Sequence, residues 1–289
     1  MRQITFVSYR GGTGKTTLAA NLSALLAKNG KNVCILDMDV YAPSLHGYFG
    51  EIIQNKNRRT INDFLLGECK VKDILQEIAP ISQFSDMGSL PGKIIGCFAS
   101  PKREDILKID GVKEDKNRMN SLKRFIHFRE ELDEKNDIDY LILDTSPGIF
   151  SITRALLSVS DIGIFILRTG EIDNTGLRNL ADYIQAVNKE HKNNAYYLVI
   201  NMFSGYCISD TQSLKPEDTC TSKANCSLPP VNKDLTTRIL NMEEYNNPMT
   251  FVPCYCDIQF AQREFLTVLG YPEHPFSQKI NELNNLINV

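Results

Sequence analysis

A glycine-rich turn near the start of the chain constrains its fold more than any other feature. Residues 9–17 read Tyr-Arg-Gly-Gly-Thr-Gly-Lys-Thr-Thr, with an apolar run at 4–7 before them and an alanine-rich run at 18–22 after them. Glycines let the backbone turn with its N–H groups pointing inward, and a following helix adds the positive end of its dipole. The pattern therefore predicts a strand, a phosphate-binding loop and a helix in succession.

Two side chains of this loop have predicted roles. Lys15 is placed to reach the β- and γ-phosphates of a nucleotide, and the Thr16 hydroxyl is placed to ligate Mg²⁺. The strict motif has a glycine where Tyr9 stands, but the flanking strand and helix favour a phosphate site over a chance glycine turn. The predicted phosphate-binding residues are Gly11, Gly12, Thr13, Gly14, Lys15, Thr16 and Thr17.

Residues 10–16, Arg-Gly-Gly-Thr-Gly-Lys-Thr, resemble the deviant phosphate loop of the MinD/ParA/Mrp family of ATPases. Members of this family carry an early lysine before the paired glycines, and Arg10 occupies that position here. The resemblance implies that Arg10 crosses to the nucleotide of a partner subunit, in a dimer that closes over two ATP molecules. Arginine keeps the charge of lysine and adds a planar fork of donors, so the role stays open to it.

A second strand is predicted to end in two carboxylates. The apolar residues at 33–36 run continuously, as in a buried parallel strand, and Asp37 and Asp39 follow them. The family has a similar Asp-x-Asp-x-Tyr-Gly-Pro-Ser stretch, with Ala42 replacing its glycine here. The resemblance implies that Asp39 orients the attacking water and that Asp37 supports the magnesium shell. The alternative is that both carboxylates only cap a loop.

A third predicted strand, over 140–143, leads into Asp144. By the same resemblance, Asp144 holds Mg²⁺ through water, and Gly148 lets the next loop sense the γ-phosphate. Ser146 departs from the proline that the family has at its position. An apolar strand that ends in aspartate is common, but this is the third match in the family's order.

Two weaker matches concern the base of the nucleotide. Asn201 ends the apolar stretch 196–200, where the family presents an amide to the adenine edge. Pro253 ends a later strand, before a loop that would close over the base. Each residue is therefore a candidate for nucleotide binding, and the alternative is that each belongs only to the sheet framework.

The remaining sequence predicts one α/β domain over residues 1–289, since no linker or repeat interrupts the chain. Alternating strands and helices favour a mostly parallel central sheet with helices on both faces, of the P-loop NTPase type. Helices are expected near 17–29, 61–78, 118–134, 172–190 and 275–287, and strands near 2–8, 33–37, 94–99, 140–144, 162–167, 196–201 and 249–253.

Charge and hydropathy restrict the partners and the location. The net charge is −3, and only 102–129 is rich in Lys and Arg. Non-specific DNA binding there is an option, but the interspersed charges favour a solvated helix face. The chain has neither an apolar N-terminal targeting stretch nor a run that could span a bilayer, which predicts a cytoplasmic protein. The amphipathic end at 276–287 carries one lysine, which favours core packing over stable membrane association.

The chain contains eight cysteines, and three of them, Cys207, Cys220 and Cys226, fall in a long polar stretch. Mrp-type carriers hold a shared iron–sulfur cluster with a Cys-x-x-Cys pair after the equivalent strand, but Asp210 stands where the second cysteine would be. The observed spacings match no standard metal motif. A zinc or iron–sulfur site, disulfides and unligated thiols therefore all stay open.

The resemblance implies a Mg²⁺-dependent ATPase that dimerises around ATP and hydrolyses it to ADP and phosphate by in-line attack of water. Such an enzyme would switch a partner in positioning, partitioning or cargo delivery. Lys15, Asp39 and Arg10 are the candidate catalytic residues. The alternatives are a metal-cluster carrier that uses ATP to gate delivery, and a nucleotide-binding scaffold with negligible hydrolysis. The identity of the cargo or partner lies outside the shared motifs.

Overall fold

The computed structural model describes residues 1–49, 58–78, 90–111, 115–135, 137–168, 195–206, 249–259 and 264–288. An eight-stranded sheet with the order β3-β4-β2-β5-β1-β6-β7-β8 forms its centre. Neighbouring strands pair in parallel, except that β3 runs antiparallel to β4. The strands are β1 (Arg2–Ser8), β2 (Val33–Met38), β3 (Gln76–Glu77), β4 (Ile94–Cys97), β5 (Tyr140–Thr145), β6 (Ile162–Arg168), β7 (Ala195–Tyr206) and β8 (Met249–Tyr255).

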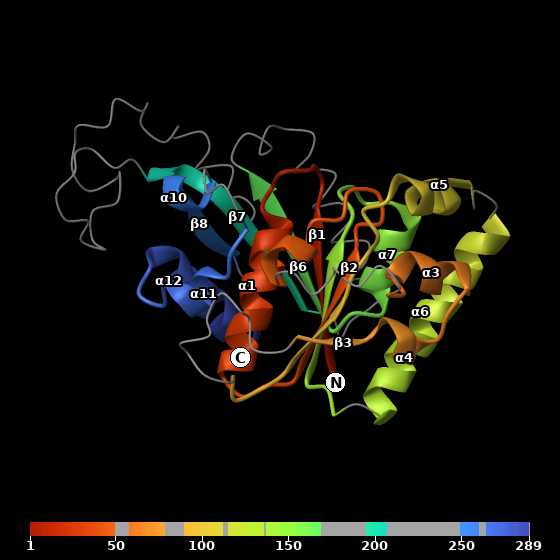
Figure 1. Ribbon diagram of the computed structural model, residues 1–289. Helices are drawn as coiled ribbons and strands as arrows, with labels where there is room; N and C mark the ends of the chain where they lie inside the picture. The colour runs from red at the N-terminus through yellow and green to blue at the C-terminus, as the bar shows by residue number, and fades with distance from the viewer. Residues whose placement is uncertain are drawn as a thin grey trace.

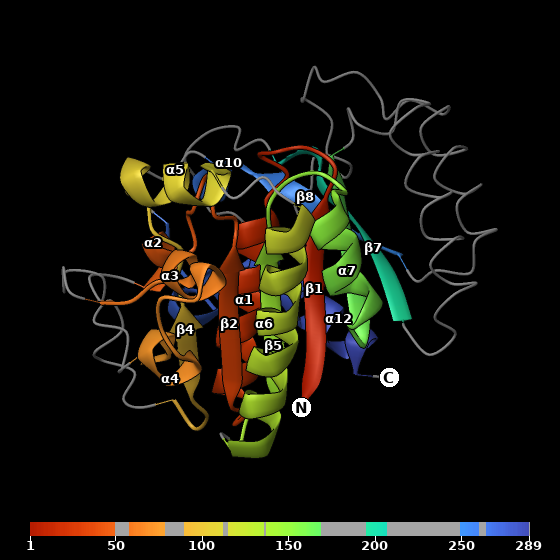
Figure 2. The same cartoon turned by 90° about the vertical axis from the view of Figure 1, so that its right-hand side faces the viewer.

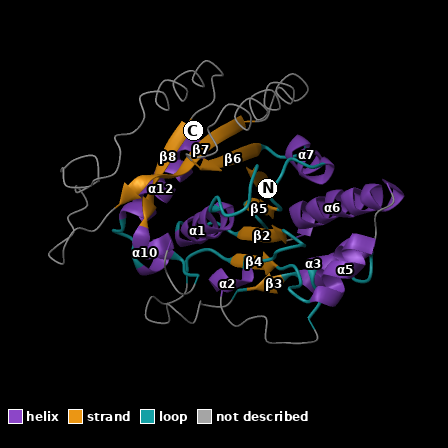
Figure 3. Cartoon of the chain, turned by 90° about the horizontal axis from the view of Figure 1, so that it is seen from above, coloured by secondary structure: helices purple, strands orange, loops and turns teal. Residues whose placement is uncertain are grey.

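Helices cover both faces of this sheet, as Figures 1 and 3 show. One face carries α1 (Lys15–Lys28), α11 (Thr267–Gly270) and α12 (Pro275–Ile287), which pack against one another. The other face carries α3 (Ile61–Leu66), α4 (Val71–Ile74), α5 (Arg103–Gly111), α6 (Asp115–Lys135) and α7 (Ser151–Ser158). Two short helices, α2 (His46–Phe49) and α10 (Cys256–Gln259), complete the described elements. The architecture confirms the predicted α/β class with a mostly parallel sheet.

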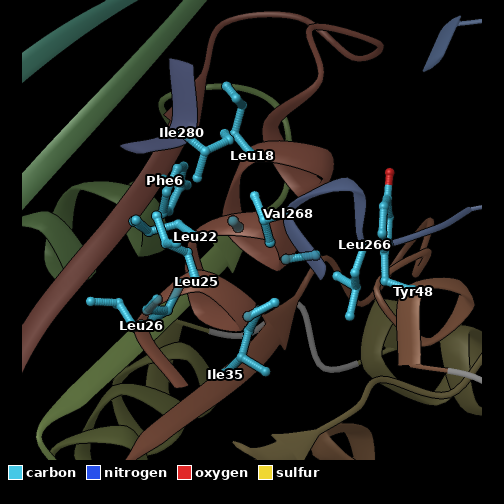
Figure 4. Packing of buried hydrophobic residues seen from close by; sticks show 14 of the residues in the cluster. Phe6, Leu18, Leu22, Leu25, Leu26, Ile35, Tyr48, Leu266, Val268 and Ile280 are labelled. Carbon is cyan, nitrogen blue, oxygen red and sulfur yellow. The ribbon is translucent and has the colours of Figure 1, made fainter. Parts of the chain in front are cut away.

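The core lies in two layers, one on each side of the sheet. On the α1 side, Leu18, Leu22 and Leu25 pack with Phe6 of β1 and Ile280 of α12 (Figure 4). On the α6 side, a second cluster is built around phenylalanine side chains of α3 and α6. Because strands covered on both faces bury every side chain, their sequences are almost continuously apolar.

The carboxyl ends of the parallel strands meet at one edge of the sheet. Figure 2 shows β1 rising from the N-terminus to this edge, and both termini lie at the opposite edge. Asp37 and Asp144 are register partners at the ends of β2 and β5, and Arg168 and Asn201 are register partners on β6 and β7. Residues that are distant in the sequence are therefore brought together around the loop that follows β1.

The structure differs from expectation over 61–78, where one helix was predicted. α3 ends at Gly67, which has a φ of 82° and donates its N–H to the carbonyls of Asp63 and Phe64. This left-handed residue stops the helix, and α4 and the antiparallel β3 follow it. α5, α7 and the short helices α2, α10 and α11 were not expected, and the helix expected at 172–190 lies outside the described residues. The single-domain assignment stays a prediction.

No helix within the described ranges has the length and apolar character needed to cross a bilayer.

Candidate functional site

The loop between β1 and α1 has the geometry of an anion cradle. Gly12 and Gly14 have φ values of 72° and 85°, a region that glycine enters at little cost. The Ser8 hydroxyl donates to the Arg10 carbonyl at 3.0 Å and closes the turn. Gly14 is the N-cap of α1 and provides no side-chain hydrogen bond to the first turn. The N–H groups of that turn are thus left for a ligand, and the helix dipole favours an anion there.

A buried ion pair lies at the base of this loop. The Nζ atom of Lys15 is 2.6 Å from Oδ1 of Asp144, and the two side chains are only 5% and 1% exposed. The lysine comes from the first turn of α1 and the aspartate from the end of β5, the strand next to β1. The structure thus brings together the residues that the sequence predicts for phosphate and for magnesium.

A second buried carboxylate, Asp37, lies beside this pair. It is fully buried, and its Oδ1 accepts a hydrogen bond from the Asp39 N–H at 3.0 Å. Its Oδ2 has no hydrogen-bond partner among the described residues. Burial and the charge of Asp144 raise the pKa of Asp37 well above its usual range, against a smaller opposing effect of the Asp39 N–H. Asp37 therefore has an unused oxygen and an ionised form that a nearby cation would stabilise, and both features suit a hard divalent cation.

Asp39 connects two loops at the rim of the site. Its Oδ1 accepts hydrogen bonds from the Ala42 N–H at 3.2 Å and from the Ser146 hydroxyl at 3.0 Å. Ser146 follows β5, so it fixes the Asp39 carboxylate relative to Asp144. Ser146 was singled out in the sequence only as a departure from the family pattern, and its role as a positioning residue for Asp39 was missed.

The other loop residues lie around these carboxylates. Thr16 is half-buried, and its hydroxyl accepts a long hydrogen bond of 3.5 Å from Ser44. Thr17 forms a 2.7 Å hydrogen bond with the hydroxyl of Tyr48. Gly148 has a φ of 101° and donates its N–H to the Ser8 carbonyl at 2.8 Å. The loop after β5 is therefore attached directly to the strand that precedes the phosphate loop.

A cavity of about 240 Å³ opens beside the phosphate loop. Both residues predicted to contact the base line it: Asn201 from β7 and Pro253 from β8, together with Gly12, Gly14 and Thr17. The structure thus places the candidate base site next to the candidate phosphate site.

Asn201 also supports the loop itself. Its Nδ2 donates to the Thr13 carbonyl at 2.7 Å, and the side chain is 5% exposed. A Cβ at Gly14 would collide with this amide, so the close approach of β7 requires glycine at that position. One of its two N–H donors is engaged with the loop, which leaves the other donor and the amide oxygen to contact a ligand.

Large side chains stand exposed on the loops that surround the site. Tyr9 is 40%, Tyr41 54% and Phe150 63% exposed, and they follow β1, Asp39 and Gly148 respectively. Arg10, two residues after β1, is exposed, whereas Asp37, Asp39 and Asp144 are buried. The described chain therefore shows no second cation that shares the burial of Lys15 at the base of the loop.

Three cysteines proposed as cluster ligands, Cys207, Cys220 and Cys226, lie outside the described residues. Within the described ranges, no group of three or more His, Cys, Asp or Glu side chains is arranged to hold a metal ion. The described part of the chain therefore gives no support to a zinc or iron–sulfur site. This result does not bear against Mg²⁺, which commonly uses one or two carboxylates with substrate phosphates and water instead of a protein cage.

Several residues at the site were missed in the sequence. Arg168 ends β6, and one of its guanidinium nitrogens lies 3.9 Å from the position of a Cβ on Gly12. Its place at a strand end, beside Asn201, was a usable signal. Tyr48 and Glu264 also belong to the site. No local pattern distinguishes them, because their positions depend on how distant segments pack.

The unpaired oxygen of Asp37 allows a test of stability. Asp37→Asn is expected to raise the free energy of unfolding without ligand by on the order of 1 kcal/mol, because it removes a carboxyl group whose ionised form is disfavoured by burial and by Asp144. Urea denaturation measures the change. Asp133→Asn is the matched control, since it removes an exposed ion pair to the N-terminus and should lower stability slightly. A loss of stability in Asp37→Asn would show that the carboxylate is favourably placed without a cation.

Comparison with known protein families extends these observations. A family model described as an AAA domain matches residues 1–197. The flagellum site-determining protein YlxH of Helicobacter pylori is 30% identical over 164 residues, which cover 56% of this chain and 47% of that protein. The septum site-determining protein MinD of Bacillus subtilis is 26% identical over 212 residues, which cover 73% of this chain and 68% of that protein. Matches to two uncharacterised ATP-binding proteins of Methanocaldococcus jannaschii span 52% and 27% of their lengths.

Solved structures show the same fold. MinD of Pyrococcus horikoshii in complex with Mg-ADP is 18% identical, with a TM-score of 0.64 over 99% of this chain and 97% of that one. The ATP complex of a single-substitution variant of Cyanothece McdA is 15% identical. Its TM-score is 0.67 over 100% of this chain and 97% of that one. At these identities the likeness concerns the fold alone. The curated relatives from Helicobacter and Methanocaldococcus are matched over about half their length or less.

Proposed function

Because this chain belongs to the MinD/ParA family of P-loop ATPases, we propose that it binds ATP with Mg²⁺ and hydrolyses it to ADP and phosphate. The observation that carries the proposal is the buried contact between Lys15 and Asp144 beneath an uncapped helix N-terminus. A cation, free N–H groups and a carboxylate are the parts that a phosphate-transfer site requires. The Mg-ADP complex of the Pyrococcus horikoshii relative supports the same ligand.

The loop residues supply the binding. N–H groups over 11–17 would surround the phosphates, and Lys15 would contact the β- and γ-phosphate oxygens. Thr16, Asp37 and Asp144 would hold Mg²⁺, whose chemical contribution is to neutralise charge on the phosphates. The unused oxygen of Asp37 fits this assignment. Asn201 and Pro253 would contact adenine from the cavity wall.

Asp39 is the proposed positioning group for the attacking water. Phosphoryl transfer needs little covalent chemistry from the protein, so the orientation of water and the compensation of charge dominate catalysis. The Ser146 hydroxyl and the Ala42 N–H hold the Asp39 carboxylate at the rim of the site, where it can accept a hydrogen bond from water. Gly148 would adjust the neighbouring loop to the state of the γ-phosphate.

The functional unit is proposed to be a homodimer in the ATP state. Arg10 is exposed, so its side chain would be available to a neighbouring subunit. Tyr9, Tyr41 and Phe150 expose apolar area on the loops around it, which a partner subunit would cover. Two sites would then face each other, each completed by the Arg10 of the partner.

The cycle is proposed to switch a protein partner in positioning, partitioning or cargo delivery, in the cytoplasm. Two relatives are named as site-determining proteins, and MinD of Aquifex aeolicus was solved in a MinC:MinD complex. These names support a protein partner as the class. DNA binding and stable membrane insertion are not part of the proposal.

Turnover of Asp39→Ala tests the enzymatic part of the proposal. We expect this variant to bind ATP with nearly the affinity of the wild type, because the carboxylate acts on water and not on phosphate. Release of phosphate should fall by about 10²-fold or more. Ser146→Ala should reduce release only about 3- to 10-fold, since it removes one hydrogen bond that orients Asp39.

A phosphate-release assay with calorimetry in parallel gives both quantities. Undiminished release in Asp39→Ala would assign the catalytic role elsewhere, with Asp37 as the next candidate. A wild-type protein that binds ATP but releases no phosphate would be a nucleotide-binding scaffold.

A further inference from the structure

The proposed chemistry leaves one carboxylate of the pocket unused. Glu264, just before α11, lines the 240 Å³ cavity together with Thr17 and Tyr255. The Tyr48 hydroxyl of α2 forms a 2.7 Å hydrogen bond with the Thr17 hydroxyl, and the Glu264 carboxylate lies close enough to this phenol to raise its pKa. Three segments that are distant in the sequence therefore meet at one phenol oxygen.

The direction of these hydrogen bonds follows from the donors present. A carboxylate only accepts, so a hydrogen bond between Tyr48 and Glu264 uses the single proton of the phenol. Thr17 must then donate its proton to the Tyr48 oxygen. Burial, together with the bond to Glu264, raises the pKa of Tyr48, so the phenol stays protonated and keeps donating. One hydrogen bond occupies only part of the carboxylate, which has about four acceptor sites.

Packing fixes this arrangement. Tyr48 is 3% exposed, and Figure 4 shows its ring beside Leu266, with the hydroxyl oxygen at the outer end. A Cβ on Gly47 would lie 3.1 Å from Cγ of Glu264, so the absence of a side chain there lets the glutamate stem pass close to α2. Glu264 is therefore held against the pocket wall by a close backbone approach as well as by the phenol.

The position of Glu264 matches a particular part of a nucleotide. Thr17 lies in the first turn of α1, beside the phosphate loop, and Thr17 and Glu264 line the same cavity. That cavity is also lined by Pro253, Ile258 and Phe276, whose apolar surface suits a base. In a nucleotide the sugar lies between the phosphates and the base, and its neutral hydroxyls can donate hydrogen bonds to a carboxylate.

We propose that Glu264, positioned by Tyr48, accepts hydrogen bonds from the 2′- and 3′-hydroxyls of the bound ribose and makes the site selective for ribonucleotides. Carboxylates perform this task in dinucleotide-binding folds. The inference rests on the proposed nucleotide-binding function and adds a specificity-determining residue to it. Loss of a charged hydrogen bond to one hydroxyl corresponds to about 10- to 100-fold in affinity.

Calorimetry with ADP and 2′-deoxy-ADP, each with Mg²⁺, tests the proposal without interference from hydrolysis. Wild-type protein is expected to bind ADP at least about 10-fold more tightly than 2′-deoxy-ADP. Glu264→Ala should bind both with affinities within about twofold of each other, near the wild-type value for 2′-deoxy-ADP. Tyr48→Phe removes only the phenol oxygen and should reduce the preference to an intermediate value. Glu273→Ala, an exposed glutamate near α12, is the matched control and should keep the full preference.

Three outcomes of this experiment would separate a failure of the ribose role from a failure of the proposed nucleotide-binding function. ADP binding by wild-type protein with no preference over 2′-deoxy-ADP overturns the ribose role and leaves the proposed function standing. A preference that persists in Glu264→Ala assigns the hydroxyl contact to another residue and also overturns the inference. Absence of binding to either nucleotide overturns the proposed function together with the inference. Glu264→Gln, which keeps the shape of the side chain and an acceptor for Tyr48, should retain part of the preference.

Discussion

Replacing Lys15 with alanine is expected to abolish measurable ATP binding. Lys15 is the cation held at the base of the phosphate loop in the described structure, and its ammonium group is already desolvated. A charged contact of this kind to the β- and γ-phosphates corresponds to at least about 100-fold in affinity. Titration calorimetry with Mg²⁺ and ATP measures the loss. Lys28→Ala, at the other end of the same helix, is the matched control and should bind normally.

The same substitution also changes stability, so folding must be separated from binding. Without Lys15, Asp144 stays buried beside Asp37 with no cation, which is expected to cost about 3–5 kcal/mol. The double variant Lys15→Met, Asp144→Asn replaces the pair with neutral side chains of similar size and should recover most of that stability. It should still fail to bind ATP. Wild-type affinity in the stable double variant would remove Lys15 and Asp144 from the nucleotide site.

Arg10→Ala is expected to bind ATP almost normally as a monomer but to lose dimerisation and hydrolysis. If Arg10 neutralises charge on the nucleotide of the partner subunit, its removal should lower turnover by on the order of 10³–10⁵. Arg10→Lys keeps the charge and should recover most of the activity. Phosphate release, with light scattering to measure mass, gives both quantities. If wild type, Arg10→Ala and Arg10→Lys show the same phosphate release and the same mass, Arg10 only points into solvent.

A mixing experiment tests whether Arg10 acts across the dimer. Combining Arg10→Ala with Lys15→Ala produces heterodimers in which one intact Arg10 faces one intact nucleotide site. Partial activity should return, although neither variant is active alone. If heterodimers form and both variants are folded, but no activity returns, Arg10 does not act in trans.

The sequence predicted much of this site because parallel strands concentrate chemistry at one edge of a sheet. Asp37, Asp144 and Asn201 each end an apolar run, and strand ends in such a sheet must lie near the loop after β1. Their pairing could not be predicted, since it depends on the strand order β2-β5-β1-β6. The contact of Lys15 with Asp144 follows from that order and not from either motif alone.

The sequence analysis was wrong over 61–78 and missed several residues of the site, and each case has a physical cause. The helix expected over 61–78 continued an apolar pattern through Gly67, whose left-handed conformation ends α3. Ser146 looked like a simple departure from a family pattern, yet it holds Asp39 through a contact between two loops. Tyr48 and Glu264 carried no signal, because the packing of α2 against the segment before α11 brings them together. Tertiary contacts of this kind have no periodicity in the sequence.

The ion pair between Lys15 and Asp144 bears, under the proposed function, on the state of the site after the nucleotide leaves. A phosphate-loop lysine with no internal counter-ion would be left buried and uncompensated in the empty protein. In this chain the Asp144 carboxylate is the anion that would take the place of the departing phosphates beside Lys15. Nucleotide binding would then exchange one anion for another at the same ammonium group, and the protein without nucleotide would keep its buried lysine compensated.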